Sequence, residues 1–420
     1  MLGPAHRSQV FVRRRNDSGL VTTPPFDRDV TIIGGCGHVG LPLGIALASR
    51  GLLVTLVDIS RSAVDIVNAG SLPFREPGAE QLVKDLTIAG SLRATTDPAA
   101  IRAAENVIVV TETPLDEHLN PDPAVFLAAM GGARPYLRDG QLVILRSTVY
   151  PGMTKEVELM IEAADLDVEV AFCPERIAEG YAMHELFSLP QIVGARTHRV
   201  RARAGKLFAN LTGSIVEVEP EEAELAKLFS NAWRYIKFAA ANQFYYIAND
   251  YGQDFERIRQ ALAADYPRAA DLPRAGFAAG PCLFKDTAQL AAFDRSSFAI
   301  GNAAMLVNEA LPLYVVDRLE QRFDLRSMTV GVLGMAFKGE SDDIRASLSY
   351  RLKAILEPRA RAVLCTDPYV TVDPTLVPLD RVLADCDLLV VATPHEAYRR
   401  LHPIQPVADV WNVLGLGVVI

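Results

Sequence analysis

The most constraining feature of the sequence is a glycine-rich turn between a short β-branched run and a helical pattern. Residues 30–33 form the run, Gly35, Gly37 and Gly40 follow, and a second β-branched run ends at Asp58. These glycines permit a tight turn, approach of the backbone to a pyrophosphate, and close packing of helix on strand. An acid about 20 residues further on accepts from a ribose 2′-OH and repels a 2′-phosphate. The pattern predicts NAD binding rather than NADP binding; a glycine-rich turn in another α/β protein is the alternative. The predicted cofactor-binding residues of this unit are Gly35, Gly37, His38, Val39, Gly40 and Asp58.

Three further apolar runs, at residues 107–110, 142–145 and 168–172, continue the alternation of strands and helices. They are followed by Thr113, by Thr148, and by Glu175 and Glu179, respectively. In doubly wound sheets ligands bind beyond the carboxyl ends of the strands, so these side chains are expected at one rim. Glu175 and Glu179 share a face if their segment is helical. The alternative for each single residue is a role in a cap or turn.

Residues 221–251 follow helical spacing without glycine or proline, and this predicts a helix of roughly 45 Å. Such a helix can bridge two domains and can pack against a second copy of itself. Lys227 and Asn231 lie four residues apart and therefore one above the other. The alternative for Lys227 is a solvated surface lysine.

A cysteine lies among small residues in the stretch from Gly276 to Asp286, with Lys285 three positions after Cys282. Small residues allow a ligand to come close, and a nearby lysine can lower the pKa of a thiol. Cys282 is thus a candidate for covalent catalysis. The alternative is a buried structural cysteine.

A second α/β unit begins near residue 329 and places Lys338 and Arg345 after a glycine turn. Basic residues at this place predict a nucleotide phosphate as the ligand; two surface bases are the alternative. The predicted fold is α/β, with two Rossmann-like doubly wound domains joined by a long central helix. The predicted segments are a disordered tail (1–28), an NAD-binding domain (29–218), a central helical dimerisation and catalytic-loop region (219–322), and a Rossmann-like domain (323–420), whose ligand the family resemblance described below specifies as a UDP-sugar.

Composition narrows the class of protein. The formal net charge of −9 disfavours nonspecific binding to nucleic acid or anionic membranes. Five scattered cysteines without a CxxC pair indicate a reducing compartment rather than disulfides or a zinc site. No uninterrupted apolar run approaches the ~18 residues of a membrane span, and we expect a cytoplasmic protein. For residues 1–28 a tail or an over-extended start is favoured over a targeting signal.

Taken together, the motifs resemble the UDP-glucose/GDP-mannose dehydrogenase superfamily over roughly residues 29–420. The motifs in the order of that family are Gly35 to Gly40, Glu76-Pro77-Gly78, Thr113-Pro114, Ser147-Thr148-Val149, Pro174-Glu175, Glu179-Gly180, Lys227 with Asn231, Cys282 with Lys285-Asp286, and Ala336-Phe337-Lys338 with Asp343 and Arg345. The resemblance implies oxidation of a sugar C6 alcohol to the acid, with two NAD molecules used in sequence. It implies a UDP-sugar, and a homodimer or higher homo-oligomer.

The resemblance also implies roles for individual residues, with no metal. Cys282 would form a thiohemiacetal and then a thioester, and Lys227 and Asn231 would stabilise oxyanions. Glu179, Thr148 and Asp286 would orient or activate water. The implied substrate contacts are Glu175, Lys227, Gly276, Lys338 and Arg345, and Thr113 and Thr148 join the cofactor site.

Some choices stay open at the level of sequence. The cysteine loop and Arg176 mix features of the UDP-glucose and the UDP-N-acetylhexosamine members, so glucose and N-acetylmannosamine are both candidate sugars. Arg268 or Arg274 would reach a neighbouring subunit. A two-electron dehydrogenase of the 3-hydroxyacid type and a non-catalytic nucleotide-sugar-binding protein are the alternative functions.

Overall fold

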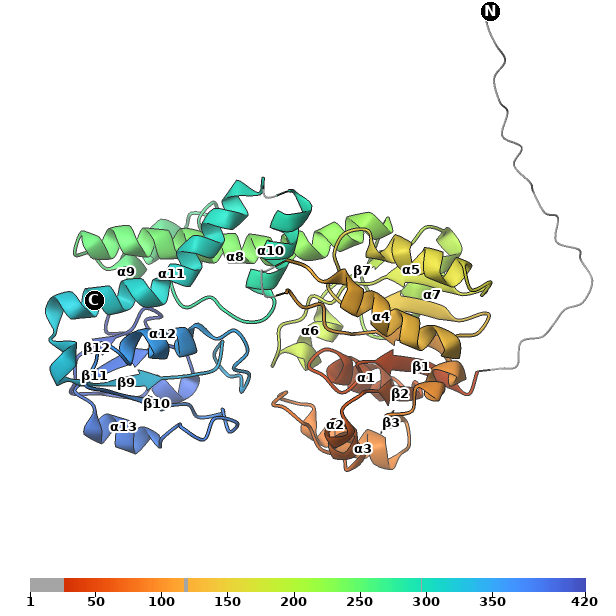
Figure 1. Cartoon of the computed structure of the whole chain (residues 1–420), viewed down its shortest axis with the longest axis horizontal. Helices are drawn as coiled ribbons and strands as arrows, with labels where there is room; N and C mark the ends of the chain where they lie inside the picture. The colour runs from red at the N-terminus through yellow and green to blue at the C-terminus, as the bar shows by residue number, and fades with distance from the viewer. Residues whose placement is uncertain (1–25, 117–119, 296) are drawn as a thin grey trace, which may run out of the picture.

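The computed structural model describes residues 26–116, 120–295 and 297–420 and places them in two α/β domains joined by one long helix (Figure 1). The predicted tail lies outside the described residues up to residue 25. Its last three residues belong to the folded domain, because the Asp27 N–H donates to Ala103 O at 3.0 Å and the first strand begins at Arg28. The prediction of disorder is therefore wrong for residues 26–28.

The first domain is built on an eight-stranded sheet in the order β3-β2-β1-β4-β5-β6-β7-β8. Its strands are β1 Arg28–Ile33, β2 Val54–Val57, β3 Leu92–Thr95, β4 Ala104–Val109, β5 Leu142–Leu145, β6 Glu169–Phe172, β7 Gln191–Gly194 and β8 Ile215–Val218. Neighbours pair parallel except β6 and β7, which pair antiparallel. The order reverses at β1, so the crevice beyond its carboxyl end is the expected ligand site.

The register aligns the strand ends at that crevice. Ile33 pairs with both Val57 and Val109, and Val109 pairs with Leu145. Apolar side chains on the two faces of the sheet form two separate core clusters under the helices. The helices of this domain are α1 Gly40–Ser49, α2 Arg61–Asn68, α3 Glu80–Ile88, α4 Pro123–Ala133, α5 Met153–Glu162, α6 Ala182–Ser188 and α7 His198–Phe208.

Helix α8, Pro220–Asp250, is the predicted long helix and runs across both domains (Figure 1). A capping box between Glu219 and Glu222, with Pro220 in the first turn, fixes its start. Buried Glu224 accepts from the backbone of Gly152 and Thr154 at the start of α5, where a negative charge complements the helix dipole. The second half of α8 packs into the core of the C-terminal domain. One helix therefore holds both domains.

Three helices that follow α8 pack against it. They are α9 Phe255–Ala263, α10 Leu283–Phe293 and α11 Ala299–Arg322. By length and composition alone, α11 is apolar enough to cross a membrane, a test that buried core helices also pass. Its Leu311 and Val315 lie in the core of the C-terminal domain, and buried Asn308 donates to Tyr235 O at 3.0 Å. Helix α11 is thus packed as a core helix against α8.

The C-terminal domain is built on a four-stranded parallel sheet in the order β10-β9-β11-β12. Its elements are β9 Thr329–Leu333, α12 Leu348–Leu356, β10 Ala362–Thr366, α13 Leu379–Asp385, β11 Leu388–Val391 and β12 Val407–Ala408. Short 3-10 segments occur at Pro98–Ala103, Arg134–Tyr136, Leu325–Ser327 and Glu396–Tyr398. The fold prediction of two Rossmann-like domains joined by a long helix is confirmed.

Candidate active site

The glycine loop between β1 and α1 has the shape that a pyrophosphate requires. A Cβ on Gly40 would lie 2.5 Å from Gly34 O, so the packing of the turn itself excludes a side chain there. A Cβ on Gly37 would meet only Gly34 O, at 3.9 Å. The protein therefore leaves space at Gly37, and this space beside the start of a helix fits a bound dinucleotide phosphate.

Asp58 follows β2 directly and stands beside this loop. Its carboxylate accepts from the backbone N–H groups of Cys36 at 2.9 Å and Ser60 at 3.0 Å. These two bonds leave further lone pairs for ribose hydroxyls. The geometry fits the predicted role, and the loop together with Asp58 would hold NAD.

The reactive cysteine lies where the two domains meet. Cys282 immediately precedes α10, and its side chain is exposed to a cleft of about 770 Å³, a volume that includes the open mouth. Residues from the first domain, α8, the cysteine loop and the C-terminal domain line this cleft together. They are Ile177, Ala178, Glu179, Lys227, Asn231, Arg234, Phe238, Phe277, Ala278, Ala279, Gly280, Pro281, Cys282, Leu283, Phe337, Lys338 and Trp411.

The surroundings of Cys282 favour the protonated thiol. Protein atoms surround it on every side except the cleft, and this burial, followed by the charge of Asp286, raises its pKa above the ordinary value. Lys227 and Lys285 act in the opposite direction but are outweighed. The direction of the lysine effect agrees with the expectation, but burial and Asp286 outweigh it.

A chain of polar contacts ties α10 to α8 and to the rim of the first sheet. Asn231 Nδ2 donates to the fully buried Asp286 at 2.5 Å, and Lys285 Nζ lies 3.2 Å from the other carboxylate oxygen. Lys285 also donates to Thr113 Oγ1 at 2.9 Å, and Thr113 donates to Thr148 O at 2.6 Å. Asp286 has no exposed surface and is held by Asn231 and Lys285, and its predicted role in orienting or activating water stays a prediction.

Glu179 is held at the cleft by two cations of the C-terminal domain. Lys338 Nζ donates to its carbonyl oxygen, and Arg345 Nη2 lies 3.2 Å from its carboxylate. Burial and the neighbouring Asp343 raise the pKa of Glu179 to about 7, against the opposing charges of Arg345 and Lys338. Glu179 can therefore exchange a proton near neutral pH.

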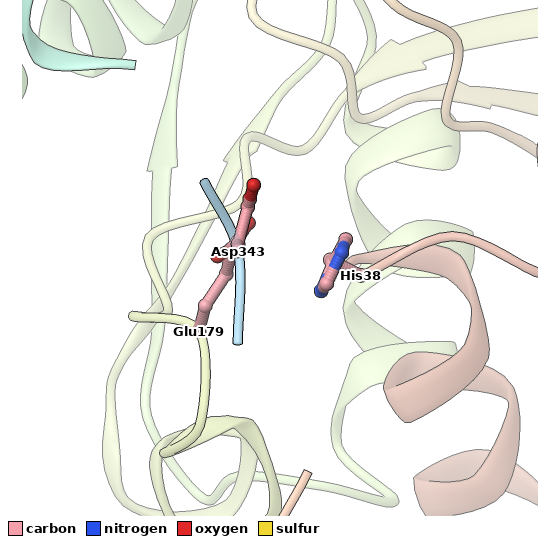
Figure 2. A group of neighbouring side chains, drawn as sticks. All are labelled: His38, Glu179 and Asp343. Carbon is pink, nitrogen blue, oxygen red and sulfur yellow. The ribbon is translucent and has the colours of Figure 1, made fainter. Parts of the chain in front are cut away.

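The side chain of His38 lies opposite Glu179 of the same domain and Asp343 of the C-terminal domain, as Figure 2 shows. Polar atoms of these three side chains lie within 4.8 Å of one another, which is a spacing compatible with a metal ion. Arg345 already supplies positive charge there, because its Nη2 lies 2.7 Å from Asp343. Burial and then Arg345 lower the pKa of His38, which favours the neutral imidazole. We assign no cation to this cluster.

The prediction for Glu175 is wrong in position. Its segment is not helical, and its carboxylate does not line the cleft but forms a buried ion pair with Arg146, whose Nε donates at 2.8 Å. Arg146 also donates to Cys173 O and to Gln191 Oε1. A separate hollow of about 310 Å³, a volume that includes its open mouth, lies beside this pair. Glu175 therefore holds strands together rather than contacting the substrate.

Gly276 also lies outside the cleft lining. Its N–H donates to Asn242 Oδ1 at 2.8 Å, and the ring of Trp411 would lie 2.3 Å from a Cβ at this position. Trp411 itself lines the cleft. Gly276 thus permits the approach of Trp411, while its predicted contact with the substrate stays a prediction.

Arg234, Phe238 and Trp411 are among the cleft residues that were not predicted as site residues from the sequence. Arg234 lies seven residues after Lys227, two turns along the same face of α8, so helical spacing alone could have identified it. No carboxylate lies within 4.0 Å of its guanidinium among the described residues. Its charge lowers the pKa of Lys338 across the cleft, after the larger effect of burial.

Comparison with known proteins agrees with this geometry. Residues 28–212 match the NAD-binding domain of the UDP-glucose/GDP-mannose dehydrogenase family, residues 221–310 its central domain, and residues 331–415 its UDP-binding domain. The chain belongs to this family. Membership makes it an NAD-dependent dehydrogenase of nucleotide sugars.

Individual relatives cover nearly the whole chain. An NDP-N-acetyl-D-galactosaminuronic acid dehydrogenase of Ralstonia nicotianae is 30% identical over 397 residues, 89% of this chain and 92% of the relative. A UDP-N-acetyl-D-mannosamine dehydrogenase of Salmonella typhimurium is 32% identical over 398 residues, which are 87% of this chain and 94% of the relative.

The fold is shared with solved structures. A UDP-N-acetylmannosamine dehydrogenase structure from Pyrococcus horikoshii matches with a TM-score of 0.85 and 27% identity over 92% of this chain and 96% of that one. A UDP-glucose dehydrogenase from Pyrobaculum islandicum matches with a TM-score of 0.84 and 28% identity over 93% and 96%. Shape alone does not separate the two sugars.

Proposed function

We propose that this protein oxidises the C6 alcohol of a UDP-sugar to the uronic acid in two NAD-dependent steps, with Cys282 as the covalent nucleophile. One observation carries the proposal: Cys282, Lys227 and Glu179 line a single cleft between an NAD-binding and a UDP-binding domain. A dehydrogenase that stops at the aldehyde or ketone needs no nucleophile at this place.

The reaction comprises two oxidations, and NAD⁺ bound by the first domain would accept the hydride in each of them. The first oxidation removes a hydride and a proton from the alcohol and gives an aldehyde. The Cys282 thiol releases its proton to solvent in the cleft, the thiolate adds to the aldehyde carbon, and the new alkoxide lies beside Lys227. Loss of a second hydride leaves a thioester. Water then cleaves the C–S bond, which gives the acid and returns the thiol.

The residues of the cleft serve these steps in distinct ways. The buried Lys227 ammonium stabilises the developing oxyanions without reorganisation, since α8 fixes its place. Asn231 lines the cleft beside it and is oriented by its bond to Asp286. Glu179 accepts the proton of the attacking water, which its pKa near 7 allows. Thr113 and Thr148 position α10 against the cofactor rim.

We propose a 2-acetamido hexose as the sugar. The relatives from Ralstonia and Salmonella are named for N-acetylated sugars, and this supports the choice. Arg234 offers a guanidinium to the cleft, and an acetamido carbonyl is a good acceptor for it. Lys338 and Arg345 are assigned to the diphosphate, for which a guanidinium fork is suited.

The test of the sugar is NADH formation by the purified protein with UDP-N-acetylmannosamine, UDP-N-acetylglucosamine, UDP-N-acetylgalactosamine, UDP-glucose and GDP-mannose in turn. The proposal expects the highest kcat/KM with an acetamido sugar. A clear preference for UDP-glucose contradicts the sugar assignment and leaves the reaction type standing.

The test of the nucleophile is Cys282→Ser, with Cys365→Ser as control, since Cys365 is buried in β10 away from the cleft. The first variant is expected to lose acid formation and the second to keep it. Acid formation at the wild-type rate by Cys282→Ser contradicts the assignment.

We also propose that α8 pairs with the same helix of a second copy. Large apolar side chains are exposed along it, with Phe229 at 53%, Trp233 at 57% and Ile247 at 62%, and monomers rarely expose such a patch. Of the two candidate arginines, Arg274 already pairs with Glu256 at 3.3 Å, so we assign Arg268 to the partner's site. Trp233→Glu should yield monomers in sedimentation analysis; an unchanged assembly contradicts this interface.

We place the reaction in the cytoplasm. Each of the five cysteines is free in the part of the chain that the structure describes, which supports a reducing compartment.

A further inference from the structure

Three consecutive residues between α2 and α3 contact three different parts of the active site. They are Phe74, Arg75 and Glu76, which we call the coupling segment. Phe74 contacts the glycine loop, Arg75 the C-terminal domain, and Glu76 the turn that carries Glu179. None of these contacts is local in sequence.

Phe74 packs on the cofactor loop. Its ring centroid lies 4.0 Å from that of His38, with an angle of 30° between the planes. His38 belongs to the glycine loop and faces Glu179 and Asp343 (Figure 2). A ligand that orders the glycine loop therefore also orders Phe74.

Arg75 joins the first domain to the second. Its guanidinium carbon lies 3.8 Å from the centre of the Tyr369 ring, and its Nη2 lies 3.5 Å from Glu340. Its backbone N–H donates to Asp342 at 3.2 Å. The Tyr369 hydroxyl donates to the same Glu340 oxygen at 2.8 Å, which fixes both partners of Arg75. Such a stacked and paired arginine contributes only while the domains are together.

Glu76 fixes the loop that presents Glu179. Its side chain is buried, and its two oxygens accept from Gly180 N and from Ala182 N, each at 2.9 Å. Lys338 of the C-terminal domain holds the same turn from the other side by donating to Glu179 O. Movement of the coupling segment would therefore displace Glu179.

We propose that the coupling segment makes binding of NAD⁺ and closure of the C-terminal domain on a nucleoside diphosphate reinforce each other, with Arg75 as the positioning residue. The two states are the closed arrangement seen here and an open one in which Arg75 has left Tyr369. Each ligand favours the closed state, so each strengthens the binding of the other by the same factor. The inference rests on the proposed function only in its choice of a uridine diphosphate ligand.

The test is a titration of UDP by calorimetry, without and with saturating NAD⁺, on the full-length protein and on Arg75→Ala. The matched control is Arg61→Ala in the neighbouring helix, whose exposed guanidinium pairs only with Asp65. NAD⁺ should lower the Kd of UDP about 5- to 20-fold in the wild type and in the control. In Arg75→Ala the loss of the Tyr369 and Glu340 contacts disfavours the closed state, so the Kd of UDP alone and the Kd of NAD⁺ alone should both rise, and the ratio should exceed the wild-type ratio.

Arg75→Lys keeps the charge near Glu340 but loses the planar stacking on Tyr369, so it should give an intermediate ratio. It also serves as the test variant if Arg75→Ala does not fold. A purely structural role for Arg75 would change both affinities and leave their ratio unchanged. A wild-type ratio of 1, or an unchanged ratio in the variants, overturns the inference alone. Failure of UDP to bind the wild type overturns both the inference and the proposed substrate.

Discussion

Replacing Glu175 and replacing Glu179 with alanine should have opposite effects. The first should lower stability, because Glu175 is part of a buried ion pair, and the second should lower activity, because Glu179 is the proposed reacting carboxylate. The side chains of Arg146 and Glu175 are only 2% and 9% exposed. Glu175→Ala leaves the guanidinium charge buried without its counterion, which costs about 3–5 kcal/mol of unfolding free energy. The Glu179 side chain is 19% exposed, and Arg345 keeps Asp343 as a partner without it. Glu179→Ala should therefore change stability by less than about 1 kcal/mol while slowing acid formation.

The assay is thermal and urea unfolding of both variants, followed by circular dichroism, beside NADH production. A loss of this size in a domain of about 200 residues corresponds to a fall in Tm of roughly 6–20 °C. Glu175→Ala should lose activity only in proportion to the unfolded fraction. An inactive Glu175→Ala with wild-type stability would refute the reasoning, since Glu175 would then act in the chemistry.

Three further predictions concern the cofactor, the pH dependence and the sugar. Gly37→Ala should fold normally but raise the KM for NAD⁺ about tenfold, roughly 1.4 kcal/mol, since its Cβ would enter the ligand space; an unchanged KM contradicts this. Thioester hydrolysis, measured by quenched flow, should rise with pH through about 7 as Glu179 ionises, and Glu179→Gln should remove that step. The pKa of Glu179 is higher in the folded protein than in the unfolded chain. The stability that its protonated form contributes at low pH is therefore lost as the pH rises toward 7. Arg234→Leu should lower kcat/KM about 10- to 100-fold for acetamido sugars and little for UDP-glucose; equal losses would place Arg234 at the diphosphate.

The elements that could be predicted from the sequence are those that depend on a local pattern of residues. The glycine loop, α8 and the strands β1, β2 and β9 follow from residue spacing and turn chemistry, and α8 was placed within a residue of its observed ends. Lys227 and Asn231 share the cleft because four residues make about one turn of a helix.

The sequence did not reveal the surroundings of side chains whose partners lie far away along the chain. The partner of Glu175 is Arg146, on another strand, and no local pattern reveals that pairing. The burial of Asp286 follows from the packing of α10 on α8. The contact of Phe74 with His38 likewise joins two turns that only the folded sheet brings together. Arg234, in contrast, was within reach of the helical pattern and was overlooked.

The central claim is that one cleft carries a sugar alcohol through to the acid on Cys282. The most direct measurement is the number of NADH molecules formed per molecule of UDP-sugar consumed, with the product identified by mass spectrometry. The account predicts two NADH and a uronic acid. One NADH with an aldehyde or ketone product would contradict it and would favour a simple two-electron dehydrogenase.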